Sequence, residues 1–215
     1  MKKLKKGIFI TLEGGEGCGK TTQVRLLKEY LSSQGYDVLV THEPGGTEIG
    51  GKIRDVLLNP EFTKMVPLTE LFLYLACRAQ HIEEVIAPAL DKGKIVLCDR
   101  FSDSTFAYQV SARGLKKTWV EGLNRIATDG IRPSLTIILD CPPEIGLRRA
   151  QRHGMGRFES ESLNFHRRVR KAFLDLAAKE PKRITVVDGS KTVERVQKDM
   201  QRIADAFLQR HRWSG

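Results

Sequence analysis

The chain has 215 residues, 40% of them hydrophobic and 29% charged, with a formal net charge of +10. This composition excludes a disordered or fibrous protein, and the length supports one domain, residues 1–215, with a sizeable core. No apolar run is long enough to cross a bilayer, and no signal-peptide core follows the basic start, so we expect a cytoplasmic protein without a membrane partner.

The positive charge and the cysteines narrow the class of protein further. A charge of +10 fits a partner that is nucleic acid, or small polyanionic substrates. Because neither an RNA-recognition signature nor zinc-finger spacing is present, we expect a nucleotide-handling enzyme with no nucleic-acid partner. The cysteines form no C-x-x-C pair and are expected to be reduced thiols; they are Cys18, Cys77, Cys98 and Cys141.

The first predicted elements are a strand, a glycine-rich loop and a helix. Residues 7–13 form an apolar run, and Val24, Leu27 and Leu31 recur at helical spacing after the loop. The segment between them fits G-x-x-x-x-G-K-[ST] at every fixed position, which predicts a loop that cradles nucleotide phosphates at a helix N-terminus. The loop consists of Gly14, Gly15, Glu16, Gly17, Cys18, Gly19, Lys20 and Thr21, and Thr22 follows it.

Two residues of this loop carry specific chemistry. The Lys20 ammonium is expected to reach the β- and γ-phosphates of a bound nucleotide, and the Thr21 hydroxyl is expected to ligate Mg²⁺. The alternative is a glycine-rich turn with a chance lysine, and the flanking strand and helix disfavour it.

Four more short strands are predicted, and helical patterns separate them. They are rich in Val, Ile and Leu and lack polar alternation, which is typical of parallel strands buried on both faces. The alternation of strand and helix predicts a three-layer α/β fold with right-handed crossovers. The predicted strands span residues 36–41, 95–98, 135–140 and 184–187, and the last helix carries apolar residues at 193, 196, 200, 203 and 207.

Polar residues follow the second and third strands, where ligands of open α/β sheets bind. The second strand leads into Glu43 and Pro44, and the third ends at Asp99 and Arg100. We expect both segments to face the phosphate loop, with Asp99 holding Mg²⁺ directly or through water and Arg100 forking onto a phosphate. For the Asp99–Arg100 dipeptide alone, a surface ion pair is the alternative.

A loop around residues 150–159 interrupts the alternation. It joins two arginine-rich helical patterns and contains Gly154 and Gly156. In a nucleotide kinase such a loop closes over the phosphates as a lid, whereas loop-length statistics alone favour an ordinary helix connection.

The segment from Asp99 to Gln109 resembles the signature of the thymidylate kinase family. Every constrained position is met: an acidic residue, Arg, an aromatic, Ser, a small polar residue, Ala, an aromatic and an amide. Other segments resemble the same family in the same order. They are residues 13–23, residues 43–47 followed by Arg54, residues 74–81, and residues 187–190.

The resemblance implies transfer of the γ-phosphoryl group of ATP to dTMP, giving ADP and dTDP. It also implies a P-loop NTPase fold, with a five-stranded parallel sheet flanked by helices, usually as a homodimer. Catalysis would involve Lys20, Glu16, Arg100 and lid arginines. Besides the phosphate loop, the implied ATP-binding residues are Arg149, Ser190 and Lys191, and Thr21 and Asp99 would hold Mg²⁺.

The resemblance also implies an acceptor pocket. Arg54 and Arg100 would clamp the dTMP phosphate, Tyr74 would stack on thymine, and Arg78 would hydrogen-bond its O4 edge. Taken singly, Tyr74 also fits a core aromatic, and Ser104 and Thr105 fit helix caps. The implied substrate-binding residues are Glu43, Pro44, Arg54, Tyr74, Arg78, Arg100, Ser104, Thr105, Tyr108 and Gln109.

The chain departs from the family pattern at several positions. Tyr74 stands where Phe is usual, His42 stands where Arg is usual, and the lid is one residue short. Gly17 stands where some members carry a catalytic arginine in the phosphate loop. In that variant the lid supplies the arginine, and the candidates are Arg157 and Arg152, with His153 third.

Two other functions are compatible with a phosphate loop. One is a kinase for another nucleoside monophosphate, such as UMP, dUMP or dGMP. The other is a non-kinase nucleotide switch or nucleic-acid-stimulated ATPase. A GTPase switch needs an Asn-Lys-x-Asp element, and no asparagine of this chain is followed by lysine; an ATPase of this kind needs a separate nucleic-acid module, for which no segment is left over.

Overall fold

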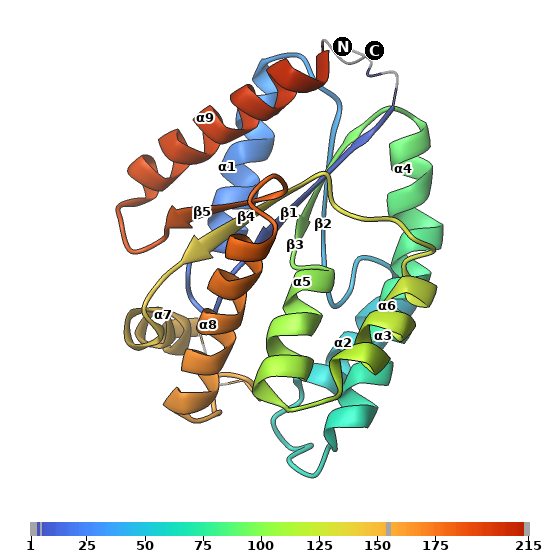
Figure 1. Cartoon of the computed structure of the whole chain (residues 1–215), viewed down its shortest axis with the longest axis vertical. Helices are drawn as coiled ribbons and strands as arrows, with labels where there is room; N and C mark the ends of the chain where they lie inside the picture. The colour runs from blue at the N-terminus through green and yellow to red at the C-terminus, as the bar shows by residue number, and fades with distance from the viewer. Residues whose placement is uncertain (1–3, 5, 154–155, 213–215) are drawn as a thin grey trace.

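The computed structural model describes residues 4, 6–153 and 156–212 (Figure 1). Five parallel strands form one sheet in the order β2-β3-β1-β4-β5. The strands are β1 (Ile8–Glu13), β2 (Val38–His42), β3 (Ile95–Asp99), β4 (Leu135–Asp140) and β5 (Ile184–Asp188). The predicted α/β fold with a five-stranded parallel sheet is confirmed.

Helices cover both faces of this sheet (Figure 1). The regular helices are α1 (Lys20–Ser33), α2 (Glu48–Leu58), α3 (Pro67–His81), α4 (Ala87–Asp91), α5 (Ser102–Thr105), α6 (Lys117–Ala127), α7 (Pro143–Ala150), α8 (Leu163–Lys179) and α9 (Val193–Arg212). Two π-helical segments, η1 (Ile82–Ile86) and η2 (Phe106–Ala112), and one 3₁₀ turn, η3 (Gln151–His153), complete the elements of the described residues.

The core lies in separate clusters on the two faces. On one face, Leu27 of α1 and Met200 of α9 are fully buried against Ile10 and Leu12 of β1. On the other face, η1 and α4 pack on Phe9 and Val96, while α8 and η2 pack around Ile138. A fully buried leucine or isoleucine contributes about 1.5–3 kcal/mol, so the sheet is stabilised from both sides, as its apolar strands predict.

The strand boundaries differ slightly from those predicted. The continuous second strand begins at Val38 instead of residue 36: Tyr36 forms an isolated bridge and packs into the α1/α9 cluster, and Asp37 separates it from the strand. Polar residues extend β2, β3 and β5 by one residue, ending at His42, Asp99 and Asp188. The carboxyl ends of the strands therefore carry the polar groups themselves.

In the last helix, the first position of the predicted apolar stripe, Val193, is 46% exposed, while Val196, Met200 and Phe207 are buried. Within the described part of the chain, no helix is both long and apolar enough to span a bilayer.

Candidate active site

The phosphate loop runs from the end of β1 to the start of α1. Gly17 and Gly19 have φ angles of 63° and 94°, in the left-handed region that favours glycine. A Cβ at Gly17 would collide with the backbone of Gly146 in α7, so the loop and α7 touch through two glycines. This contact and the positive φ together explain why glycine stands at position 17.

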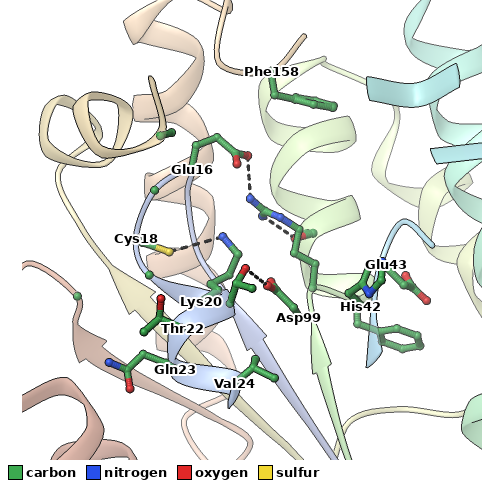
Figure 2. Close-up of a pocket in the computed structure, with 18 of the residues that line it drawn as sticks. Glu16, Cys18, Lys20, Thr22, Gln23, Val24, His42, Glu43, Asp99 and Phe158 are labelled. Carbon is green, nitrogen blue, oxygen red and sulfur yellow. Dashed lines mark hydrogen bonds and ion pairs between the residues drawn. The ribbon is translucent and has the colours of Figure 1, made fainter. Parts of the chain in front are cut away.

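Lys20 lies at the centre of the loop. It is 7% exposed, and its Nζ donates to the carbonyl oxygens of Gly14 and Gly15 at 3.2 and 2.8 Å. Figure 2 shows Lys20 and Cys18 within the loop and Asp99 across from them at the end of β3. The buried ammonium is held where a phosphate chain on the loop would meet it.

Thr21 and Asp99, the two residues expected to hold Mg²⁺, are in direct contact. The Thr21 hydroxyl donates to Asp99 Oδ2 at 2.8 Å, although the two residues are 78 positions apart. A hydroxyl and a carboxylate beside a phosphate loop suit Mg²⁺, which takes few protein ligands and completes its shell with phosphate oxygens and water. The donor set therefore fits the ion.

Arg100 does not pair with its neighbour Asp99. Its backbone has a φ of 69°, rare for a residue with a side chain, and its Nη2 lies 2.7 Å from Glu16 Oε1. Tyr108 donates its hydroxyl to the same oxygen at 2.7 Å. Burial alone would raise the pKa of Glu16, but Arg100, Lys20 and the Tyr108 hydrogen bond lower it to about 2.

A fully buried carboxylate supports the Arg100 turn. Glu13, at the end of β1, accepts the backbone N–H of Phe101 at 2.8 Å and the Ser104 hydroxyl at 2.5 Å. Burial and the nearby Asp103 raise the pKa of Glu13 to about 7. Asp103 is itself held by the Arg183 guanidinium, at 2.7 Å.

Arg78 is the most enclosed charged residue of the predicted base pocket, with 1% exposure. It pairs with Glu43 at 2.7 Å and donates to Thr105 at 2.8 Å and to Asn124 at 2.5 Å. Burial would raise the pKa of Glu43, but Arg78 and His81 keep it below its ordinary value. The guanidinium is thus fixed on three sides, which pre-orients it for a ligand.

The other acceptor residues surround Arg78. Arg54 donates to the carbonyl oxygen of Pro44 at 2.6 Å, which ties α2 to the segment after β2. Tyr74 is half-buried, and the centroid of its ring lies 6.4 Å from that of Phe158. Burial raises the pKa of Tyr74 above the ordinary value. Ser104 and Thr105 lie within α5 and hydrogen-bond Glu13 and Arg78, respectively.

The predicted adenine-side residues lie where β5 leads into α9. Arg149 of α7 donates to the carbonyl oxygens of Gly189 and Ser190 at 3.0 and 3.3 Å. Arg149 and Lys191 line the main cavity, whereas the exposed Ser190 does not and instead donates to Asp188.

The two lid arginines differ in environment. Arg152 is exposed on η3. Arg157 is buried, with Nη1 at 2.7 Å from Glu70 and Nε donating to the Leu57 carbonyl at 2.7 Å. Residues 154 and 155 of the predicted lid, and the side chain of His153, lie outside the described residues. The catalytic roles expected of Arg152 and Arg157 remain predictions.

A single cavity of about 1500 Å³ joins these groups. It runs from Lys191 and Arg149, past the phosphate loop, to Tyr74, Arg78 and Gln109. This room suffices for two nucleotides placed end to end.

Several supporting residues were not singled out from the sequence: Glu13, Glu70, Asn124, Arg113, Phe158 and Asp103. The sequence did contain a signal for Glu70: it precedes Tyr74 and Arg78 at four-residue intervals, which places all three on one face of α3. For Asn124, 46 positions from Arg78, the sequence carries no such signal.

Comparison with known proteins assigns the family. The family model described as "Thymidylate kinase" matches residues 12–200. The chain belongs to the thymidylate kinase family. The thymidylate kinase of Trichlorobacter lovleyi is 52% identical over 210 residues, which are 94% of this chain and 98% of the relative. That of Geotalea uraniireducens is 51% identical over 195 residues, 87% and 92% of the two chains.

A solved structure agrees with this assignment. The crystal structure of thymidylate kinase from Ehrlichia chaffeensis matches with a TM-score of 0.76 and 34% identity, covering 93% of this chain and 99% of that one. The resemblance seen in the motifs is therefore confirmed over nearly the whole chain. The switch and ATPase alternatives are not favoured by these matches.

Proposed function

We propose that this thymidylate kinase family member transfers the γ-phosphoryl group of ATP to dTMP, giving ADP and dTDP, with the whole chain acting as one domain. The observation that carries the proposal is the cavity that joins the phosphate loop to the pocket around Arg78. ATP would lie between Lys20 and Arg149, and dTMP between Arg100 and Arg78. The segment around residues 150–159 would close over both as a lid.

The reaction needs charge neutralisation more than a base. The phosphate of a monophosphate ester has a second pKa of about 6 and is already anionic near neutral pH. Lys20 would neutralise the donor phosphates, Arg54 and Arg100 would orient the acceptor phosphate, and Arg152 or Arg157 would reach the phosphoryl group in transfer. Glu16 holds Arg100 in place through the 2.7 Å ion pair.

Thr21 and Asp99 are the residues that would hold Mg²⁺. When bound, the ion neutralises the charge of the donor phosphates and fixes their geometry. The Thr21 hydroxyl and Asp99 Oδ2, already 2.8 Å apart, supply one neutral and one anionic oxygen for this task.

The base pocket supports a pyrimidine acceptor. Tyr74 would stack on the base, and Arg78 would donate to its O4 edge. Thr105, Tyr108 and Gln109 would line the base and sugar, while Glu43 and Pro44 shape the wall behind Arg54 and Arg78.

We further propose a homodimer that acts in the cytoplasm. Helices α2, α3 and α6 lie together on one side of the molecule (Figure 1) and expose large apolar side chains. Such a surface is typical of a protein–protein interface. All four cysteines are free and buried, as expected in a reducing compartment. The exposed apolar residues are Ile49, Val56, Leu68, Phe72, Trp119 and Ile126.

The first test is the magnesium dependence of dTDP formation from ATP and dTMP. Replacing Asp99 by Asn removes the anionic oxygen, so we expect the Mg²⁺ concentration for half-maximal rate to rise about tenfold or more. Asp91→Asn, at the exposed end of α4, is the matched control and should leave it unchanged. ADP release that does not depend on dTMP would contradict the proposed function.

A further inference from the structure

Glu70 is a buried acidic residue that lies behind two residues of the cavity lining, Gln109 and Arg157. It lies in the first turn of α3, is 1% exposed, and holds three partners. Its Oε1 accepts hydrogen bonds from Gln109 Nε2 at 2.9 Å and from Arg113 Nε at 3.2 Å. Its Oε2 lies 3.1 Å from Arg113 Nη2 and 2.7 Å from Arg157 Nη1.

These partners determine how the Gln109 amide is oriented. A guanidinium only donates hydrogen bonds, so both oxygens of Glu70 serve as acceptors toward Arg113 and Arg157. The amide group that faces Glu70 must therefore be the NH₂ of Gln109, since an amide oxygen would meet a carboxylate oxygen. The Gln109 carbonyl oxygen is then directed away from Glu70.

That carbonyl oxygen is available to a ligand. Gln109 is 2% exposed and lines the same cavity as Tyr74 and Arg78. Among the described residues, none donates a hydrogen bond to its Oε1, whereas its Nε2 is held by Glu70. The same cavity thus contains a fixed acceptor, from Gln109, and a fixed donor, Arg78.

We propose that Glu70 is a positioning residue that fixes the Gln109 amide with its oxygen toward the acceptor base, and so selects bases with a protonated ring nitrogen. Thymine and uracil carry N–H at N3, whereas cytosine presents a lone pair there. Cytosine would place two acceptors against each other in a buried site, which is costly. This inference rests on the proposed function and deepens it to the specificity of the base pocket.

The test compares dUMP with dCMP, which differ at N3 and at the neighbouring C4 substituent. We expect wild-type enzyme to show a higher kcat/KM for dUMP than for dCMP. In Glu70→Gln the new amide can donate or accept, so Gln109 is free to turn over. The dUMP-to-dCMP ratio of kcat/KM should then fall about tenfold, the size of one buried hydrogen-bond mismatch. Arg78 still donates a hydrogen bond toward the C4 substituent in this variant, so part of the preference for dUMP over dCMP remains.

Two further variants separate positioning from stability. Arg113→Gln removes one guanidinium from Glu70 but leaves the Glu70–Gln109 hydrogen bond, so it should keep the wild-type ratio even if it lowers the melting temperature. Gln109→Leu removes the acceptor while Glu70 keeps both arginines, so it should lower the ratio as Glu70→Gln does. This variant tests the acceptor alone; if Glu70→Gln fails to fold, Glu70→Asp takes its place, because the shorter carboxylate keeps the charge but no longer reaches the Gln109 amide.

The outcomes are distinguishable. A lowered ratio in the Glu70 variant, with the ratio retained in Arg113→Gln, supports the positioning role, provided that Gln109→Leu lowers the ratio as well. A wild-type ratio in a folded Glu70→Gln or Gln109→Leu enzyme overturns it and leaves the dTMP kinase function standing. A wild-type protein without activity on dTMP overturns the proposed function, and the inference with it.

Discussion

Glu13 shows how one buried residue supports the site without touching a substrate. Its carboxylate receives the Phe101 N–H and the Ser104 hydroxyl, and thereby braces the turn on which Arg100 adopts its rare backbone conformation. Burial and Asp103 raise its pKa from 4.5 to about 7. The protonated form is therefore favoured by folding.

This shift predicts a stability that falls as the pH rises. Between about pH 4.5 and 7 the folded protein holds a proton at Glu13 that the unfolded chain has released. The contribution of Glu13 to the free energy of unfolding is therefore lost across that window. In Glu13→Gln the group cannot ionise, so urea unfolding at pH 5 and pH 8 should show wild type losing stability relative to the variant.

Other titrating groups are common to both proteins and cancel in this difference. The pKa of Glu16 is lowered to about 2, so its contribution to the free energy of unfolding is full above pH 4.5 and is lost only as the pH falls from 4.5 toward 2. A wild-type minus variant difference that stays constant between pH 5 and 8 would contradict the raised pKa.

Among single residues, the sequence could predict the site residues that belong to a local motif. Lys20 and Thr21 follow from the loop pattern, and Asp99 follows from its place at a strand end beside that loop. Glu70 and Asn124 act through tertiary hydrogen bonds to Gln109 and Arg78. Such contacts depend on how helices pack, which spacing along one segment does not determine.

Among the elements, the loop from β5 to α9 depends on α7 for its position. Arg149 holds this loop by two hydrogen bonds to backbone oxygens, at 3.0 and 3.3 Å. The neighbouring Arg148 lies on the exposed side of the same helix. The two arginines therefore form a matched pair with different expected roles.

Replacing Arg149 by Ala should weaken ATP binding and leave dTMP binding intact. Loss of both contacts releases the adenine-side wall, so we expect the KM for ATP to rise about tenfold and the KM for dTMP to stay unchanged. Steady-state kinetics measure both constants, with Arg148→Ala as the control. Equal changes in the two KM values, or none, would remove Arg149 from the ATP site.

The elements themselves were largely predictable because parallel strands buried on both faces read as continuous apolar runs. The errors lie at strand ends. Tyr36 is apolar and buried yet precedes β2, whereas polar His42, Asp99 and Asp188 belong to strands. Hydrophobicity reports burial, and the backbone ladder continues into polar residues where the sheet meets the site.

At the scale of the whole molecule, the exposed apolar side chains of α2, α3 and α6 support the homodimer. Ile126 is 79% exposed, the highest value among the exposed large apolar residues of the described chain. Replacing Ile126 by Glu would place a charge in the buried interface, which costs several kcal/mol in a dimer and little in a monomer.

We therefore expect wild type to elute as a dimer and Ile126→Glu to shift toward monomer, measured by light scattering at matched concentrations. Val186→Glu is the control, since Val186 is 40% exposed on the edge strand β5, away from α6 (Figure 1). A monomeric wild type, or a dimer that Ile126→Glu leaves intact, would contradict this interface.

The most direct measurement is ADP release from ATP and Mg²⁺ against a panel of nucleoside monophosphates that includes dTMP, dUMP, UMP, dCMP and dGMP. The cavity, its phosphate loop and the base pocket around Tyr74 and Arg78 predict a strong preference for dTMP. A preference for another monophosphate would contradict the roles given to Tyr74 and Arg78. ADP release that needs no acceptor would contradict the kinase itself.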